Sequence, residues 1–343
     1  MVNVGVVGLG MMGMTHLDVY AKRAAAHGDV QVVAVADLDE ARRTGKAKAG
    51  GNIEGQAQGG FDFSSVKAYA DAADLIADPE VGLVDVCLPT PAHVRFAIAA
   101  MEAGKHVLIE KPLARNSEQA AQIVAAAGKA KGLTMCAMCM RFWPGWTWLK
   151  DAVDAQTYGK TMAATFRRVA DHPGGAFYEN GDACGGAILD LHIHDADFVQ
   201  YLFGMPTAVT SRGYAKHTDR VDHVVTQYEF AEGSGAPIVV AEGGWSMTKG
   251  FGFQMQYTVN FERATAVFDL AGESPLMLYE PGEAGRPIEL PPGMGYEAEI
   301  AYFLHCIAAG ETPTRVTLAS AAESVRLIEA EAQSVAEGQT VRL

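Results

Sequence analysis

The sequence predicts an α/β N-terminal domain followed by an α+β C-terminal domain. Up to about residue 130, short runs rich in β-branched residues alternate with alanine-rich stretches, which is typical of parallel strands joined by helices. Beyond Pro144, alternating apolar runs are separated by short turns, which indicates an antiparallel or mixed sheet. The 343 residues exceed one ordinary core, so we expect two domains, 1–133 and 134–343.

The elements of the N-terminal domain follow from this alternation. Helices are expected over the residues that follow or separate the strands, at Met12–His27, Ala92–Glu102 and Asn116–Lys131, with a further one after Asp39. The five glycines of Ala49–Gly60 predict a surface loop. Strands are expected at Val2–Val7, Val30–Ala36, Val84–Leu88, His106–Ile109 and Thr134–Met140.

The C-terminal domain is expected to contain one helix before its later strands and two helices at its end. These helices are Gly186–Phe203, Tyr296–Ala309 and Leu318–Glu337. Its strands are expected at Tyr158–Ala170, Thr207–Tyr214, Val221–Phe230, Pro237–Trp245, Gly252–Phe261 and Thr265–Leu270.

Composition and charge exclude several classes of function. The net charge of −14 argues against nucleic-acid and anionic membrane partners, which need clustered lysine and arginine. The sequence has no apolar run of about 18 residues, and glycines interrupt its apolar start, so we expect a cytoplasmic protein. Cys136 and Cys139 form a C-x-x-C pair within an apolar strand, which favours buried thiols over a redox or metal site.

The first chemical motif is a glycine-rich turn between the first strand and the first helix. Gly8 permits a tight turn, Gly10 lets the backbone approach a diphosphate, and Gly13 allows close packing of helix and strand. Met11 and Met12 then lie at the N-terminus of the helix, where free N–H groups favour an anion. The alternative is a glycine-rich packing turn.

Three further positions lie where strands of this domain end. Asp37 follows the second strand, 24 positions after Gly13, close to the spacing expected of an acid that binds the adenosine ribose. Its carboxylate would repel a 2′-phosphate, which favours NAD over NADP. Pro89 and Thr90 stiffen the loop after the next strand, where ligands bind, whereas His93 could instead stabilise its own helix.

The second chemical motif is Glu110-Lys111-Pro112, directly after the apolar run Val107–Ile109. A buried strand seldom ends in an ion-forming pair without a function. Near a nicotinamide, burial and the positive charge of the cofactor would lower the pKa of Lys111 toward acid–base use. The alternative is a solvated lysine at a strand exit.

The third motif is the densest group of ionisable residues in the chain. On one continuous helix, Asp190, His194 and Asp197 share a face, and Asp190 could orient the His194 ring as a general base needs. A metal site is disfavoured, because histidines two positions apart, as at His192 and His194, do not converge on a helix. We therefore expect no metal.

With these motifs, the chain resembles the Gfo/Idh/MocA oxidoreductases over essentially its whole length. The matching segments are Gly8–Gly13, Thr90–His93, Ala103–Ala114, Gly185–Asp197 and Tyr296–Phe303. The resemblance implies an N-terminal Rossmann domain and a C-terminal domain on a large open sheet that mediates homodimers or homotetramers. It implies NAD(P)-dependent oxidation of a sugar or polyol hydroxyl, and a Lys111–Pro112 bond that is often cis.

Carried over residue by residue, the resemblance makes Lys111 the catalytic lysine, Asp190 its acidic partner and His194 the proton-transfer histidine. His192 departs from the small residue common in relatives and is expected to reach the pocket. Two other functions stay open, an NAD-recycling glycosidase and a non-enzymatic NAD(P)- and sugar-binding regulator. Weaker candidates for substrate contact are Arg141, Trp143, Arg168 and His172.

Overall fold

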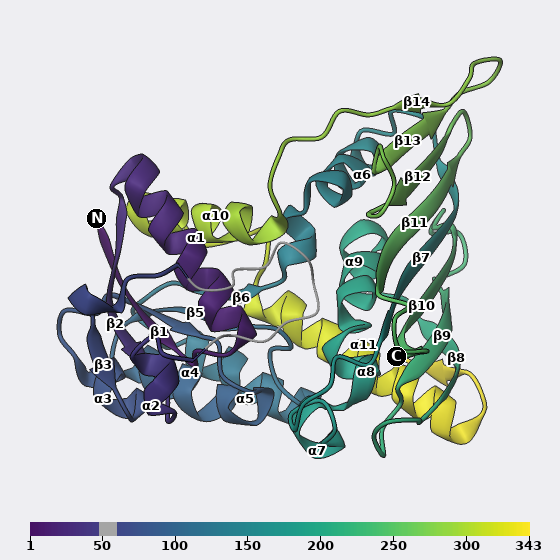
Figure 1. The fold of residues 1–343 in the computed structure, drawn as a ribbon. Helices are drawn as coiled ribbons and strands as arrows, with labels where there is room; N and C mark the ends of the chain where they lie inside the picture. The colour runs from purple at the N-terminus through teal and green to yellow at the C-terminus, as the bar shows by residue number, and fades with distance from the viewer. Residues whose placement is uncertain (48–59) are drawn as a thin grey trace. The chain divides into compact units, whose positions relative to one another are not determined.

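The computed structural model describes residues 1–47 and 60–343, which divide into two compact units (Figure 1). The first unit comprises Met1–Cys139 and Tyr296–Ala322, and the second comprises Met140–Gly295 and Glu323–Leu343. The units therefore differ from the expected division at residue 133, because the last parallel strand pairs with its neighbour and a C-terminal segment returns to the first unit. The predicted loop at Ala49–Gly60 lies, apart from Gly60, outside the described residues.

The first unit is built on a six-stranded parallel sheet, as predicted, with one short strand that the sequence did not reveal. The strand order β3-β2-β1-β4-β5-β6 reverses its direction of winding beside β1, and ligands bind at such a switch point, at the carboxyl ends of the strands. The strands are β1 (Val2–Val7), β2 (Val30–Ala36), β3 (Lys67–Tyr69), β4 (Leu83–Val86), β5 (His106–Glu110) and β6 (Thr134–Ala137).

Helices connect these strands, and their ends follow local capping chemistry. Asn116 caps α5 by accepting a hydrogen bond from the Gln119 N–H, and Asp71 caps α3 in the same way through Ala73. The α1 helix has glycine at its cap position and no side-chain cap. The helices of this unit are α1 (Met11–His27), α2 (Glu40–Arg43), α3 (Ala72–Ala77), α4 (His93–Glu102), α5 (Ser117–Ala127) and α10 (Gly295–Ala309).

The second unit contains a nine-stranded, mostly antiparallel sheet of order β14-β13-β12-β11-β7-β10-β9-β8-β15, with one parallel pair, β10 with β7. The sequence predicted six of these strands. The three that it missed are short and lie near the edges of the sheet. The strands are β7 (Thr161–Asp171), β8 (Ala208–Tyr214), β9 (His223–Glu229), β10 (Ile238–Met247), β11 (Phe253–Phe261), β12 (Thr265–Asp269), β13 (Leu276–Tyr279), β14 (Arg286–Pro287) and β15 (Val341–Arg342).

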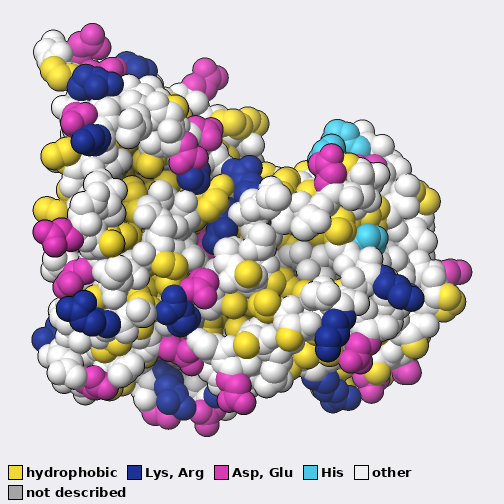
Figure 2. Space-filling view, turned by 180° about the vertical axis from the view of Figure 1, so that it is seen from behind, with side chains coloured by type: hydrophobic (Ala, Val, Ile, Leu, Met, Phe, Trp, Pro, Cys, Tyr) yellow, Lys and Arg dark blue, Asp and Glu magenta, His cyan; other side chains and the backbone are white. Residues whose placement is uncertain are grey.

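Helices cover one face of this sheet (Figure 1). An aromatic cluster holds them there: the buried Trp146 ring of α6 packs on Phe166, Phe198 and Tyr257. Figure 2 shows acidic and basic side chains interspersed on the face of the molecule that it presents. The helices are α6 (Pro144–Asp154), α7 (Gly181–Cys184), α8 (Gly186–Asp190), α9 (Ile193–Phe203) and α11 (Leu318–Glu337).

The predicted continuous helix Gly186–Phe203 is wrong, since the structure divides it into α8 and α9. At the break, the His192 N–H donates to the carbonyl of Ala187, five residues back, so the regular helical hydrogen bonding ends. Among the described residues, no helix is long and apolar enough to cross a membrane.

Candidate active site

The glycine-rich turn of the first unit forms a cradle that only glycine fits at two of its positions. Gly8 has a φ of +89°, and a Cβ there would lie 2.6 Å from the Cys87 carbonyl oxygen. A Cβ on Gly13 would lie 1.9 Å from the Gly8 carbonyl oxygen. A Cβ on Gly10 would meet nothing within 4 Å, so the N-terminus of α1 borders open space. An uncapped helix N-terminus beside open space fits a dinucleotide diphosphate.

The Asp37 carboxylate is held at the end of β2, next to this cradle. Its Oδ2 accepts a hydrogen bond of 2.8 Å from the Leu9 N–H, and its Oδ1 accepts one of 2.8 Å from Asp39. The Arg42 guanidinium lies 3.9 Å from Oδ2, whereas Arg43 donates to backbone carbonyls. The acid is thus fixed at the place where an adenosine ribose would lie in such a fold.

His93 is a structural residue of the loops that follow β4 and β5. Its fully buried ring lies between two carbonyl oxygens, 2.7 Å from that of Leu88 and 3.0 Å from that of Pro112. Burial lowers the pKa of His93. His93 thereby links these two loops through their carbonyl groups, a structural role that differs from the stabilisation of its own helix that the sequence left open. Thr90 is buried in the short 3₁₀ turn before it, next to Pro89.

Lys111 follows β5 at the carboxyl edge of the parallel sheet, where the cradle and Asp37 also lie. The Lys111 N–H donates to Oε2 of Glu110 over 2.9 Å, and the Glu110 side chain is almost fully buried. The Lys111–Pro112 peptide bond is cis, as the resemblance implied. The first unit thereby brings the predicted nucleotide-binding residues and the lysine to one edge of one sheet.

In the second unit, Asp190 is the last residue of α8 and His194 is the second residue of α9, and both are partly buried. Asp197 does not join them. Its carboxylate accepts hydrogen bonds from Arg141 Nε at 2.9 Å and from Nη2 at 2.6 Å, and a third from Ser324. The expectation that all three residues share one face of one helix is therefore wrong: His194 and Asp197 lie on α9, whereas Asp190 ends α8.

Two weaker substrate candidates are engaged in buried ion pairs. Arg168 is 3% exposed and donates to both carboxylate oxygens of Asp195. His192 is fully buried, with Nε2 2.9 Å from Glu331, and its ring fills the space where Gly243 has no side chain. Burial opposes the charge of His192, but Glu331 outweighs it and raises the pKa of the ring. These contacts correct the expectation that either residue reaches a substrate.

Arg141 is similarly buried against Asp197, with its guanidinium over the Tyr201 ring. Trp143 is half-buried at the start of α6. The His172 ring stacks on His217 with ring centroids 4.5 Å apart, and its Nδ1 accepts a hydrogen bond from the Gly174 N–H.

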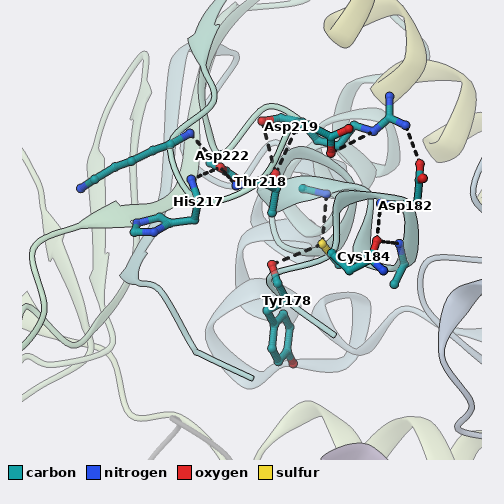
Figure 3. Close-up of polar contacts among 12 residues, drawn as sticks. Tyr178, Asp182, Cys184, His217, Thr218, Asp219 and Asp222 are labelled. Atoms are coloured by element: carbon teal, nitrogen blue, oxygen red, sulfur yellow. Dashed lines mark hydrogen bonds and ion pairs between the residues drawn. The ribbon is translucent and has the colours of Figure 1, made fainter. Parts of the chain in front are cut away.

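One organising residue of this region had no signal in the sequence. The Asp222 carboxylate accepts hydrogen bonds from the N–H groups of His217 and Thr218 (Figure 3). It also accepts them from the Lys216 N–H and from the Trp245 indole. Burial opposes its charge, but these hydrogen bonds outweigh it and lower the pKa of Asp222. Asp222 thereby fixes the loop that carries His217, next to His172.

Comparisons with known proteins agree with this geometry. Residues 2–138 match the family model described as an oxidoreductase family with an NAD-binding Rossmann fold, and residues 146–267 match the model of the Gfo/Idh/MocA C-terminal domain. The chain belongs to the Gfo/Idh/MocA family. The six-stranded parallel sheet lies within the part of the chain that matches the Rossmann model. Most strands of the nine-stranded sheet lie within the part that matches the C-terminal model.

Several curated proteins similar to this chain are named as dehydrogenases of inositol or of a sugar derivative. The myo-inositol 2-dehydrogenase of Thermotoga maritima is 33% identical over 204 residues, which are 59% of this chain and 54% of that protein. The levoglucosan dehydrogenase of Pseudarthrobacter phenanthrenivorans is 28% identical over 61% of this chain and 53% of that protein. The matches thus span about half the length of these relatives.

Solved structures of the family share the fold over nearly the full chain. A levoglucosan dehydrogenase in complex with NADH has a TM-score of 0.84 at 22% identity, covering 99% of this chain and 98% of that chain. The same enzyme has also been solved with NADH and levoglucosan. A UDP-N-acetylglucosamine 3-dehydrogenase from Acidithiobacillus ferrooxidans has a TM-score of 0.77 at 22% identity, covering 97% of each chain.

Proposed function

We propose that the chain is an NAD-dependent dehydrogenase that acts on a hydroxyl-bearing carbon of a sugar, a polyol or a sugar derivative. The observation that carries the proposal is the carboxyl edge of the parallel sheet. There the cradle of Gly8, Gly10 and Gly13 follows β1, the fixed Asp37 carboxylate follows β2, and Lys111 follows β5. The dehydrogenases named among the relatives support the same class of reaction.

The residues of this edge would hold the dinucleotide. The turn Gly8–Gly13, with Met11 and Met12, would take the diphosphate on the N–H groups of α1, and Asp37 would take the adenosine ribose. Pro89, Thr90 and Glu110 would border the nicotinamide half. When bound, the dinucleotide supplies a ring carbon that accepts or donates hydride.

The proposed roles in proton handling fall to three side chains. His194 takes the proton of the substrate hydroxyl, and Asp190 stabilises the imidazolium that results. Lys111 donates a hydrogen bond to the substrate oxygen as negative charge develops on it. In the reverse direction the same groups return the proton to the oxygen.

The preference for NAD over NADP rests on the Asp37 carboxylate. It already lies at the end of β2 with its oxygens fixed by the backbone, and an anion there would repel a 2′-phosphate. NADP is the alternative that Arg42, 3.9 Å from this carboxylate, would favour. For the substrate, Trp143 and His172 are our proposed contacts, since Arg141, Arg168 and His192 are held by carboxylates.

The test is the absorbance at 340 nm with NAD, and then NADP, across a panel of polyols, aldoses and sugar acids. We expect NADH to accumulate with one substrate class, and Lys111→Ala or His194→Ala to lower kcat by about 100-fold or more with unchanged nucleotide affinity. Lys22→Ala, which removes an exposed lysine paired with Asp18, is the matched control and should keep full activity.

Three outcomes would contradict the proposal. Unchanged kcat in Lys111→Ala would remove the lysine from the reaction. Silence across the panel, in protein shown to bind NADH by fluorescence titration, would favour the regulator, and sugar cleavage without net NADH would favour the NAD-recycling glycosidase.

We also propose that the second unit forms a homodimer or homotetramer through the face of its sheet opposite the helices. Along β9 the burial alternates strictly, and Val225, Gln227 and Glu229 are exposed on one side. Tyr214 and Ile238 extend this face with large exposed side chains. Light scattering on the purified protein would test it: we expect a multiple of the monomer mass and a shift toward monomer in Val225→Glu, and a monomeric wild type would contradict it.

A further inference from the structure

A buried histidine of the first unit contacts carboxylates on two neighbouring strands, one of which ends at Glu110, just before Lys111. His16 lies in α1 and is fully buried. Its Nδ1 lies 2.8 Å from Oδ2 of Asp85 on β4, and its Nε2 lies 3.2 Å from Oε1 of Glu110 on β5. The first contact is a hydrogen bond, and the second is an ion-pair contact without hydrogen-bond alignment.

The surroundings of His16 favour the imidazolium, which has N–H groups toward both carboxylates. Burial opposes the charge, but Asp85 outweighs it and the pKa of His16 is raised well above its usual value. Tyr20 donates a 3.0 Å hydrogen bond to the same Asp85 oxygen, and the Cys87 thiol donates to the other. The Asp85 carboxylate that binds the His16 ring is therefore itself held in place, and the orientation of the ring is fixed.

Glu299 of α10 completes the group. It is fully buried, neither of its carboxyl oxygens has a hydrogen-bond partner, and it lies with His16 Nε2 and Glu110 within 4.8 Å. Burial and the neighbouring Glu110 carboxylate raise the pKa of Glu299 well above its usual value. On this side of the ring, Glu110 is the residue whose carboxylate lies at ion-pair distance from Nε2.

Glu110 has two oxygens with two different contacts. Oε1 faces His16, whereas Oε2 accepts the hydrogen bond of the Lys111 N–H. We propose that His16 is a positioning residue for Lys111, acting through the Glu110 carboxylate. This inference rests on the proposed function, because it concerns the placement of the lysine that we assign to the reaction.

Stability alone does not account for this arrangement. Buried ion pairs give little net stabilisation, and apolar residues of similar volume often replace them without loss. The ring instead ties α1, which begins at the nucleotide cradle, to the end of β5, which carries Lys111. A displacement of a reacting group by about 1 Å can lower a rate by about 100-fold, so this tie has a catalytic consequence.

The test is a double-mutant cycle between His16→Gln and Lys111→Ala. We expect His16→Gln to lower kcat by about 10-fold to 100-fold, with KM and NADH affinity unchanged. Because His16 acts through Lys111, His16→Gln should lower kcat no further in the Lys111→Ala background. If His16→Gln does not fold, Glu110→Gln, which keeps size and the acceptor for Lys111, should give the same pattern.

The control is His106→Gln, at the other end of β5, where the ring accepts a hydrogen bond from the Leu133 N–H. It tests loss of a histidine from the same strand and should leave kcat unchanged. Full activity in His16→Gln, or an equal loss of kcat in both backgrounds, would overturn the inference. So would one equivalent of a divalent metal in the purified protein, because Nε2 would then be a ligand.

The two proposals fail in distinguishable ways. If Lys111→Ala keeps full activity in the wild-type background, the proposed function fails. If Lys111→Ala is inactive while His16→Gln is as active as wild type, only the positioning role fails.

Discussion

The two units of the chain bury charge in different ways. In the second unit, each buried cation of this kind has a carboxylate of its own: Arg168 binds Asp195, Arg141 binds Asp197 and His192 binds Glu331. In the first unit, the carboxyl groups of Asp85, Glu110 and Glu299 surround the single imidazole of His16.

This difference separates structural charges from charges near a reaction. Paired charges of opposite sign fix helices on a sheet. Arg168 and His192 use their N–H groups to bind a buried carboxylate, so we do not propose them as substrate contacts. The group around His16 is unbalanced, includes an acid without a hydrogen bond, and touches the segment that carries Lys111. Unbalanced buried charge of this kind is more often associated with functional sites.

The largest expected effect concerns the paired charges of the second unit. Arg168→Met leaves the buried Asp195 carboxylate without its cation, and we expect a loss of about 3–5 kcal/mol in the free energy of unfolding. Urea denaturation would measure it. Arg326→Met is the control, since the Arg326–Glu323 pair is exposed and its loss should cost about 0–1 kcal/mol. Equal losses in both variants would show that the buried pair stabilises the fold no more than the exposed pair does.

Two buried glutamates, one in each unit, are expected to differ in how much they contribute to the free energy of unfolding. Glu331→Gln removes the charge that faces His192 and should cost about 1.5–3 kcal/mol of unfolding free energy. Burial and Glu110 raise the pKa of Glu299, which favours its neutral form, so we expect Glu299→Gln to change the unfolding free energy by less than about 1 kcal/mol at neutral pH. A large loss in Glu299→Gln, measured by the same urea titration, would show that Glu299 is ionised in the folded protein.

The smallest expected effect is a slope in stability with pH. The folded pKa of His16 is raised, so its stabilisation is complete below its unfolded pKa of about 6.5 and is lost as the pH rises through the folded value. Glu299, with a raised folded pKa, acts with the same sign. From about pH 6 to about pH 9, stability should fall, and His16→Gln should remove up to about 1.4 kcal/mol per pH unit of that slope.

Thermal unfolding across this pH range is the measurement, with His106→Gln as the matched variant. Burial lowers the pKa of His106, so its effect is confined to acidic pH and its loss should not change the slope above neutral pH. An unchanged slope in His16→Gln would mean that the ring is neutral in the folded protein.

Local patterns in the sequence were enough to predict much of the first unit. The β-branched runs gave the parallel strands, and the glycine spacing gave the cradle, because both depend on neighbours in the chain. The short strands β13, β14 and β15 have no comparable pattern. The helix over Gly186–Phe203, on which Asp190, His194 and Asp197 were expected to share a face, instead ends at Asp190 and a new helix starts at Ile193.

The sequence did not predict which residues far apart in the chain would pair with each other. Asp197 is bound by Arg141, 56 positions away, and His16 is bound by Asp85, 69 positions away. Neither pairing leaves a periodic signal, because it depends on which strand lies beside which. Glu299 lies in the segment Tyr296–Phe303, which carries part of the family resemblance, but nothing in that segment indicates that its side chain lies near His16.

The most direct test of the central claim follows the hydride itself. The substrate found in the panel would be prepared with deuterium on its hydroxyl-bearing carbons and incubated with the enzyme and NAD. Mass spectrometry would then measure the mass of the reduced nucleotide. The account predicts one deuterium in each reduced nucleotide, and formation of that nucleotide about 100-fold or more slower with Lys111→Ala. Reduced nucleotide without deuterium, or its equal formation by Lys111→Ala, would contradict it.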